Sequence, residues 1–148
     1  MTKEEYMREA INEGMLAKEA GEWPFGAVIV KDGKIIARGE CNEKRTKSVL
    51  GHAELQAINT ACNALGSNNL SGCTIYCTNE PCLMCSSAII QAKIGTVIYS
   101  LKRDDLSHIL RKRHLNIVDL ITDSGYAISV KSGVLKEETL QMFEGVKK

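Results

Sequence analysis

The sequence carries almost no net charge, because 19 lysines and arginines are balanced by 18 aspartates and glutamates. A formal charge of +1 does not suggest a protein that coats a polyanion, although a local basic patch is compatible with it. No apolar run approaches the roughly 20 residues that a membrane-spanning helix needs. The first ten residues, MTKEEYMREA, are charged from the start and lack the apolar stretch of a signal peptide. We therefore expect a cytoplasmic protein without a membrane partner.

The sequence also shows no linker, no repeat and no low-complexity segment. The chain has only two prolines and no stretch rich in proline, glycine and serine that would separate two folding units. Its 148 residues are enough for one core, since chains of this size bury roughly two thirds of their unfolded surface. We therefore predict a single domain over residues 1–148.

Apolar residues recur in a pattern that predicts alternating helices and strands. Residues 3–19 have the spacing of a helix with one apolar face. Asp32-Gly33 separates two apolar runs and predicts a tight β-hairpin turn. This alternation favours a sheet covered by helices on both faces. The further elements that we predict are helices over 52–65, 82–93, 104–115 and 136–146, and strands over 73–78, 96–100 and 126–131.

Cysteine, in contrast, is present six times. The cytosol is reducing, so thiols there more often pack in cores, bind metals or react than form a disulfide framework. Cys82 and Cys85 follow Pro81 in the stretch EPCLMC, where proline suits the first turn of a helix. Taken alone, this pair fits a metal clamp, a redox pair or a core. Cys73 and Cys77 lie about 13 Å apart on a predicted strand and cannot share one ion.

A second motif favours the metal. GHAE opens the helix predicted over 52–65 and places His52 and Glu54 two residues apart. Two helix starts can face one another at one edge of a sheet in an α/β domain. Two thiolates and one imidazole would then give zinc three protein ligands and an open fourth position, which is the catalytic pattern. We therefore predict one zinc ion per chain, with His52, Cys82 and Cys85 as its ligands.

Glu54 is predicted to carry protons rather than to bind the metal. Zinc brings the pKa of a bound water to around 7, and a carboxylate beside that water can accept its proton and return it to a leaving amine. A structural zinc site does not need such a carboxylate. A catalytically inactive, zinc-stabilised binding module is therefore only our second alternative.

His-x-Glu followed by Pro-Cys-x-x-Cys is the signature of the zinc nucleobase deaminases. Together with CTIYCTN and PFGAVIVKDGKIIARG, it makes nearly the whole chain similar to the cytidine deaminase-like superfamily. The resemblance implies a three-layer α-β-α sandwich with a five-stranded mixed sheet. It also implies a homodimer, and an activity that replaces an amino group on a nucleobase by an oxo group and releases ammonia. Substrate binding would fall to Asn42, Phe25 and the backbone near Ala53.

The choice of substrate depends on finer features. PFGAVIV and INTACNALG are most similar to the bacterial guanine deaminases, and the leucine of KSVLGHAE is faintly similar to the fungal cytosine deaminases. The tRNA adenosine deaminases usually carry a small aliphatic residue in place of Phe25. We therefore expect hydrolytic deamination of a small guanine-type or cytosine-type nucleobase or nucleoside. Deamination of adenosine to inosine in tRNA is the alternative.

A run of basic residues bears on that alternative. Arg111, Lys112 and Arg113 could contact the phosphates of an RNA. However, Asp104 and Asp105 lie nearby, and no aromatic residue is interleaved with the charges to stack on an unpaired base. We therefore favour a solvated helix face for this run and a small molecule as the partner.

Overall fold

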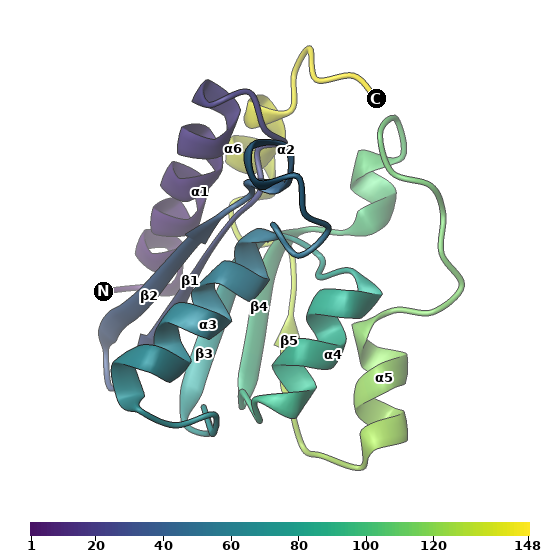
Figure 1. Cartoon of the computed structure of the whole chain (residues 1–148). Coiled ribbons are helices and arrows are strands. Elements are labelled where there is room, and N and C mark those ends of the chain that lie inside the picture. The colour runs from purple at the N-terminus through teal and green to yellow at the C-terminus, as the bar shows by residue number, and fades with distance from the viewer.

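The computed structural model describes all residues 1–148, and a five-stranded sheet with the order β2-β1-β3-β4-β5 forms its centre (Figure 1). The predicted hairpin is present, because Asp32 and Gly33 both take the positive φ that a two-residue turn of this kind requires (50° and 76°). The first three strands pair antiparallel, and β3, β4 and β5 pair parallel. The sheet is therefore mixed, as predicted. The strands are β1 (Gly26–Lys31), β2 (Lys34–Glu40), β3 (Cys73–Asn79), β4 (Thr96–Leu101) and β5 (Ser129–Lys131).

Helices cover both faces of this sheet (Figure 1). The alternation of side chains along β1 shows how, because Ala27 and Ile29 join one buried cluster while Val28 and Val30 join the other. The first cluster lies under α3, α4 and α5, and the second under α1 and α6. This arrangement is the predicted three-layer α-β-α sandwich. The helices are α1 (Lys3–Glu19), α3 (Ala53–Leu65), α4 (Leu83–Gln91), α5 (Ile117–Ser124) and α6 (Lys136–Met142).

The backbone of helix α3 packs directly against β2, because β2 contains a glycine beneath it. A Cβ atom on Gly39 would lie 2.0 Å from the carbonyl oxygen of Ala53 and 2.7 Å from the backbone nitrogen of Ala57. No side chain fits there, so the backbone of α3 rests directly on β2. This contact sets the position of the first turn of α3, which carries the His-x-Glu motif.

The segment after Ser100 departs from the prediction. The predicted helix over 104–115 is wrong, because only a short 3₁₀ helix, η1 (Arg103–Leu106), forms there. Residues 111–116 are all exposed, so this basic run has no apolar stripe with which to pack on the sheet. Asn116 instead begins α5, since its Oδ1 accepts the N–H groups of Val118 at 2.9 Å and of Asp119 at 3.2 Å.

A shorter strand and an additional helix are further differences from the predicted elements. The strand predicted over 126–131 forms only over its last three residues, as β5. A short helix between β2 and α3, α2 (Glu43–Thr46), was not predicted at all. None of the helices is long and apolar enough to cross a lipid bilayer.

Candidate functional site

Two helix starts meet at one edge of the sheet, as the sequence predicted. His52 is the residue directly before α3, and Cys82 is the residue directly before α4, where its sulfur accepts the N–H of Cys85 at 3.5 Å. The Nδ1 atom of His52 lies 3.5 Å from Sγ of Cys82 and 3.4 Å from Sγ of Cys85. All three potential ligand atoms lie within 4.8 Å of one another. The structure thus brings the three predicted ligands together.

The electrostatics of the two thiols fit a metal site. A hydrogen bond from the Cys85 thiol, with others from His52 and from the Cys85 backbone, lowers the pKa of Cys82 to about 4 despite its burial. The same pairing with Cys82 raises the pKa of Cys85, so the two sulfurs hold one proton between them. One thiolate is therefore ready at neutral pH, and zinc would replace the shared proton. Two sulfurs and one imidazole nitrogen are a donor set that zinc prefers, with one position left for catalysis.

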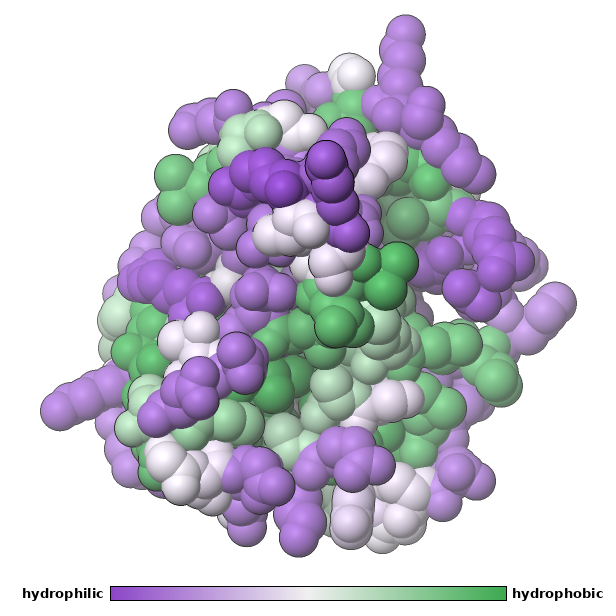
Figure 2. Space-filling model, viewed as in Figure 1, coloured by the Kyte–Doolittle hydropathy of each residue, from purple (hydrophilic) through white to green (hydrophobic).

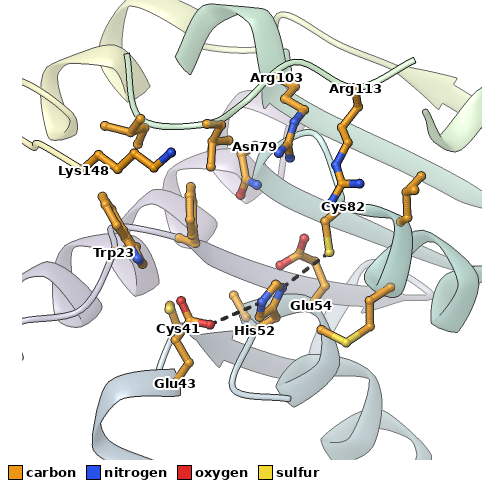
Figure 3. Close-up of a pocket in the computed structure, with 16 residues that line it drawn as sticks. Trp23, Cys41, Glu43, His52, Glu54, Asn79, Cys82, Arg103, Arg113 and Lys148 are labelled. Atoms are coloured by element: carbon orange, nitrogen blue, oxygen red, sulfur yellow. Dashed lines mark hydrogen bonds and ion pairs between the residues drawn. The ribbon is translucent and has the colours of Figure 1, made fainter. Parts of the chain in front are cut away.

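Glu54 lies beside the ligand set without joining it. Its side chain is buried, and it lines the same cavity as His52 and Cys82 (Figure 3). Burial, followed by the negative charge on Cys82, raises the pKa of Glu54 to about 7. A carboxyl group with a pKa near the working pH can both accept and donate a proton. The placement therefore agrees with the predicted proton carrier.

A cavity of about 410 Å³ opens in front of these residues. Phe25 and Ala53, both predicted to contact substrate, line it. Figure 3 shows that its wall also contains side chains that sequence reasoning did not assign to the site. Trp23 is the only tryptophan and stands two residues from Phe25, which was the one available signal for it. The other unassigned lining residues with polar groups are Cys41, Glu43, Asn79, Arg103, Arg113 and Lys148.

Asn42 is the predicted substrate-binding residue that the structure does not place on the cavity wall. It precedes α2, and its N–H donates to the carbonyl of Gly51 at 2.9 Å. Its Oδ1 atom is buried and makes no hydrogen bond to another protein group. A contact between Asn42 and the substrate stays a prediction.

Helix α2 is fastened by a buried carboxylate that the sequence did not indicate. Glu22 accepts the backbone N–H groups of Lys44 and Arg45 at 2.9 Å each, and Nε of Arg45 at 3.1 Å. Burial alone raises the pKa of Glu22, but these donors outweigh it and hold the pKa below its ordinary value. The side chain of Glu22 is fully buried. Glu22 therefore holds the first turn of α2 next to the metal site.

Glu80, the first residue of the EPCLMC stretch, holds the loop that follows β4. Its Oε1 accepts the backbone N–H of Arg103 at 3.1 Å. The guanidinium Nε of Arg103 in turn donates to the carbonyl of Arg111 at 2.7 Å. These two bonds fix Arg103 at the cavity wall, and they tie the basic run to η1.

Comparisons with known proteins agree with this site. Residues 1–101 match the model of the "cytidine and deoxycytidylate deaminase zinc-binding region". A tRNA-specific adenosine deaminase of Bacillus subtilis is 37% identical over 145 residues, covering 93% of this chain and 84% of the relative. A guanine deaminase of the same organism is 42% identical over 108 residues, covering 71% of this chain and 68% of the relative.

Solved structures give the same two groups. One from a study of A-to-I editing by tRNA:A34 deaminases at the wobble position of transfer RNA has a TM-score of 0.79. It is 33% identical and covers 93% of this chain and 98% of that one. A guanine deaminase from Bacillus subtilis has a TM-score of 0.70 at 40% identity, and covers 72% of this chain and 69% of that one.

These relatives contradict the expected guanine-type or cytosine-type small substrate. Similarity to a tRNA-specific adenosine deaminase extends over 93% of the chain, whereas similarity to the guanine deaminase covers 71%. The expectation relied on the stretches PFGAVIV and INTACNALG, and it set the tRNA enzymes aside because of Phe25, whose ring packs against Phe143 with centroids 5.6 Å apart. Phe25 therefore contributes to core packing as well as to the cavity wall, so a large residue at this position does not identify the substrate. The reaction class is unaffected, and the chain belongs to the cytidine and deoxycytidylate deaminase zinc-binding family of hydrolytic deaminases.

Proposed function

We propose that this chain deaminates an adenosine of tRNA to inosine. The observation that carries the proposal is the 37% identity to a tRNA-specific adenosine deaminase along nearly the full chain. The other relatives of this kind include that of Aquifex aeolicus, which is 43% identical over 68% of the chain. A tRNA substrate also suits the cytoplasmic location that the sequence predicts.

Positive charge around the cavity supports an RNA substrate. Arg103, Arg113 and Lys148 all line the cavity that contains Glu54, although the chain as a whole is almost neutral. Figure 3 shows Lys148 on one side of the cavity and the two arginines on the other. Cations placed around a pocket can contact the phosphates on both sides of a nucleotide that enters it.

An aromatic ring also stands at this cavity. The basic run itself contains no aromatic residue, but the fold brings Trp23 from the segment before β1 to the wall that Lys148 shares (Figure 3). Single-stranded RNA is recognised largely by stacking unpaired bases on aromatic side chains. Trp23 thus supplies the feature whose absence from the local sequence argued against RNA.

The residues of the chain divide the chemistry among them. Zinc, when bound by His52, Cys82 and Cys85, supplies a Lewis acid that makes water nucleophilic near neutral pH. Glu54 accepts the proton of that water on its carboxylate and donates it to the amino group that leaves as ammonia. Ala53 begins α3, where the first N–H groups have no helical partners and can hold the polar edge of the base.

The experiment compares substrates of different size with the zinc-loaded protein. An in vitro transcribed tRNA with adenosine at the wobble position is incubated, digested to nucleosides and analysed for inosine by mass spectrometry. Ammonia release from free guanine, cytosine and adenine is measured in parallel, and the Glu54→Gln variant controls for contaminating activity. Inosine that depends on Glu54 supports the proposal. Turnover of a free base with no inosine in the tRNA would overturn it.

A homodimer belongs to the same proposal. Val49 and Leu50, in the loop that leads to His52, are 75% and 58% exposed, and Figure 2 shows apolar residues gathered over the neighbouring face of α3 and α4. Exposed apolar surface next to a site favours association with another protein surface. A second copy covering this face is tested by sedimentation velocity. Leu50→Glu should release monomers, and a wild-type protein that sediments as a monomer at micromolar concentration would refute the dimer.

A further inference from the structure

The two ring nitrogens of His52 face different partners. Nδ1 points at the sulfurs of Cys82 and Cys85, whereas Nε2 lies 3.6 Å from Oε2 of Glu43. When Nδ1 of a histidine binds a metal, the proton of the ring resides on Nε2, and a carboxylate that receives it fixes both the tautomer and the ring orientation. We propose that Glu43 is a positioning residue of this metal site, which holds the imidazole of His52 through its Nε2–H.

The observed distance is compatible with this role. At 3.6 Å the two atoms are somewhat beyond a formed N–H···O hydrogen bond, which spans roughly 2.7–3.2 Å. The terminal torsion of a glutamate side chain is broad, so a small rotation of the carboxylate closes the gap. The side chains of both residues are about 30% exposed (30% for His52 and 31% for Glu43), so Glu43 is free to make this rotation.

The backbone of Glu43 is held firmly next to His52. A Cβ atom on Gly51 would lie 2.5 Å from both the nitrogen and the Cα of Glu43, so the two segments are packed backbone to backbone. The N–H of Asn42 bonds to the carbonyl of Gly51, and Glu22 holds the two residues that follow Glu43. The backbone of Glu43 is therefore fixed, and its side chain reaches His52 directly, as a positioning residue requires.

Glu43 also lines the cavity, so it has one competing role, which is direct contact with the substrate. The two roles differ in what they change. A residue that orients His52 alters the affinity for zinc in the absence of any substrate, whereas a residue that contacts the substrate alters only KM. Measurements on the metal alone therefore decide between them, and they do so whether or not tRNA is the substrate.

The test uses the full-length variants Glu43→Ala and Glu43→Gln, with Asp104→Asn as the matched control. Asp104 is an exposed carboxylate of η1 that does not line the cavity. The zinc dissociation constant is measured by competition with a chromophoric chelator. Loss of a carboxylate behind a ligating histidine typically weakens metal binding about 10–100-fold. We expect a loss in this range for Glu43→Ala, a smaller loss for Glu43→Gln, whose amide oxygen can still accept a hydrogen bond from Nε2–H of His52, and none for the control.

Two further measurements distinguish a change in the metal site from a general loss of stability. Circular dichroism of the metal-free proteins should show nearly equal melting temperatures, because the side chain of Glu43 is 31% exposed and its ion-pair partner His52 is 30% exposed. Substitution with Co²⁺ should give ligand-field bands that are shifted in Glu43→Ala and are restored toward the wild-type position in Glu43→Gln. Zinc affinity and cobalt spectra identical to wild type in Glu43→Ala would overturn the proposal, and a raised KM in that variant would then assign Glu43 to the substrate.

Discussion

Replacing Glu22 by alanine should destabilise the protein more than any other single carboxylate substitution discussed above. The side chain is fully buried, and its loss leaves the N–H groups of Lys44 and Arg45 without their acceptor and the Arg45 guanidinium without its nearest carboxylate. Hydrogen bonds to a charged group contribute roughly 1.5–3 kcal/mol each, whereas the pair with Arg45 adds less than a buried ion pair because the Arg45 side chain is 43% exposed. Since α2 lies near the surface and water can replace part of the loss, we expect about 3 kcal/mol.

The assay is equilibrium urea unfolding of the metal-free protein, followed by circular dichroism. Glu138→Ala is the matched control, because Glu138 also pairs with an arginine, Arg8, at 3.1 Å, but with both side chains largely exposed. Such a pair contributes about 0–1 kcal/mol. A loss for Glu22→Ala no larger than that of the control would show that α2 is held by other contacts, and would refute the reasoning.

The stability lost in Glu22→Ala should also depend on pH and should become smaller on acidification. The pKa of Glu22 is held below its ordinary value in the folded state, so its ionised form stabilises the fold above the unfolded pKa of about 4.3. That contribution is lost as the pH falls through the folded pKa. The difference in unfolding free energy between wild type and Glu22→Ala should therefore be full at pH 7 and shrink below about pH 4. A difference that grows on acidification would contradict this.

Three further predictions concern the site and its approach. Glu54→Gln should keep its zinc, measured by atomic absorption, and lose about 10²–10⁴-fold in turnover, because the proton carrier is gone; wild-type turnover would exclude that role. Arg113→Ala should weaken tRNA binding and lower the slope of log affinity against log salt by about 1, while the exposed neighbour Lys112→Ala, which does not line the cavity, should change neither. Gly39→Ala should cost about 1–3 kcal/mol or more and loosen zinc, since the new Cβ meets a carbonyl of α3 at 2.0 Å, whereas Gly95→Ala, with its nearest contact at 3.9 Å, should be tolerated.

Features that depend on neighbouring residues could be predicted from the sequence. The hairpin follows from Asp32-Gly33, because this dipeptide accepts the positive φ angles of a tight turn. The starts of α3 and α4 follow from glycine and proline placed just before the two motifs, and the metal ligands follow from the spacing within those motifs. The order of helices and strands up to β4 followed as well, apart from the short α2, because the apolar period changes between elements.

Features that depend on distant residues could not be predicted. Glu22 is an ordinary glutamate in the sequence, and its role appears only when α2, about 20 residues later, folds over it. The same holds for Glu43, which becomes relevant only because Gly51 brings His52 against it. Helix α5 differs, because the capping box of Asn116 and Asp119 that begins it is a local signal in the sequence.

The same distinction explains why the reaction was predictable and the substrate was not. The reaction needs a few groups within hydrogen-bond distance of one atom, and two short motifs supply them. The substrate meets a cavity wall assembled from Trp23 before β1, Arg103 and Arg113 after β4, and Lys148 beyond α6, and we propose that this wall selects it. The sequence shows Trp23 and the basic run that contains Arg113, but only the fold gathers them with Arg103 and Lys148 at one cavity. A substitution among them should therefore change which substrate is bound while leaving zinc and Glu54 in place, so that binding and chemistry can be lost separately in this chain.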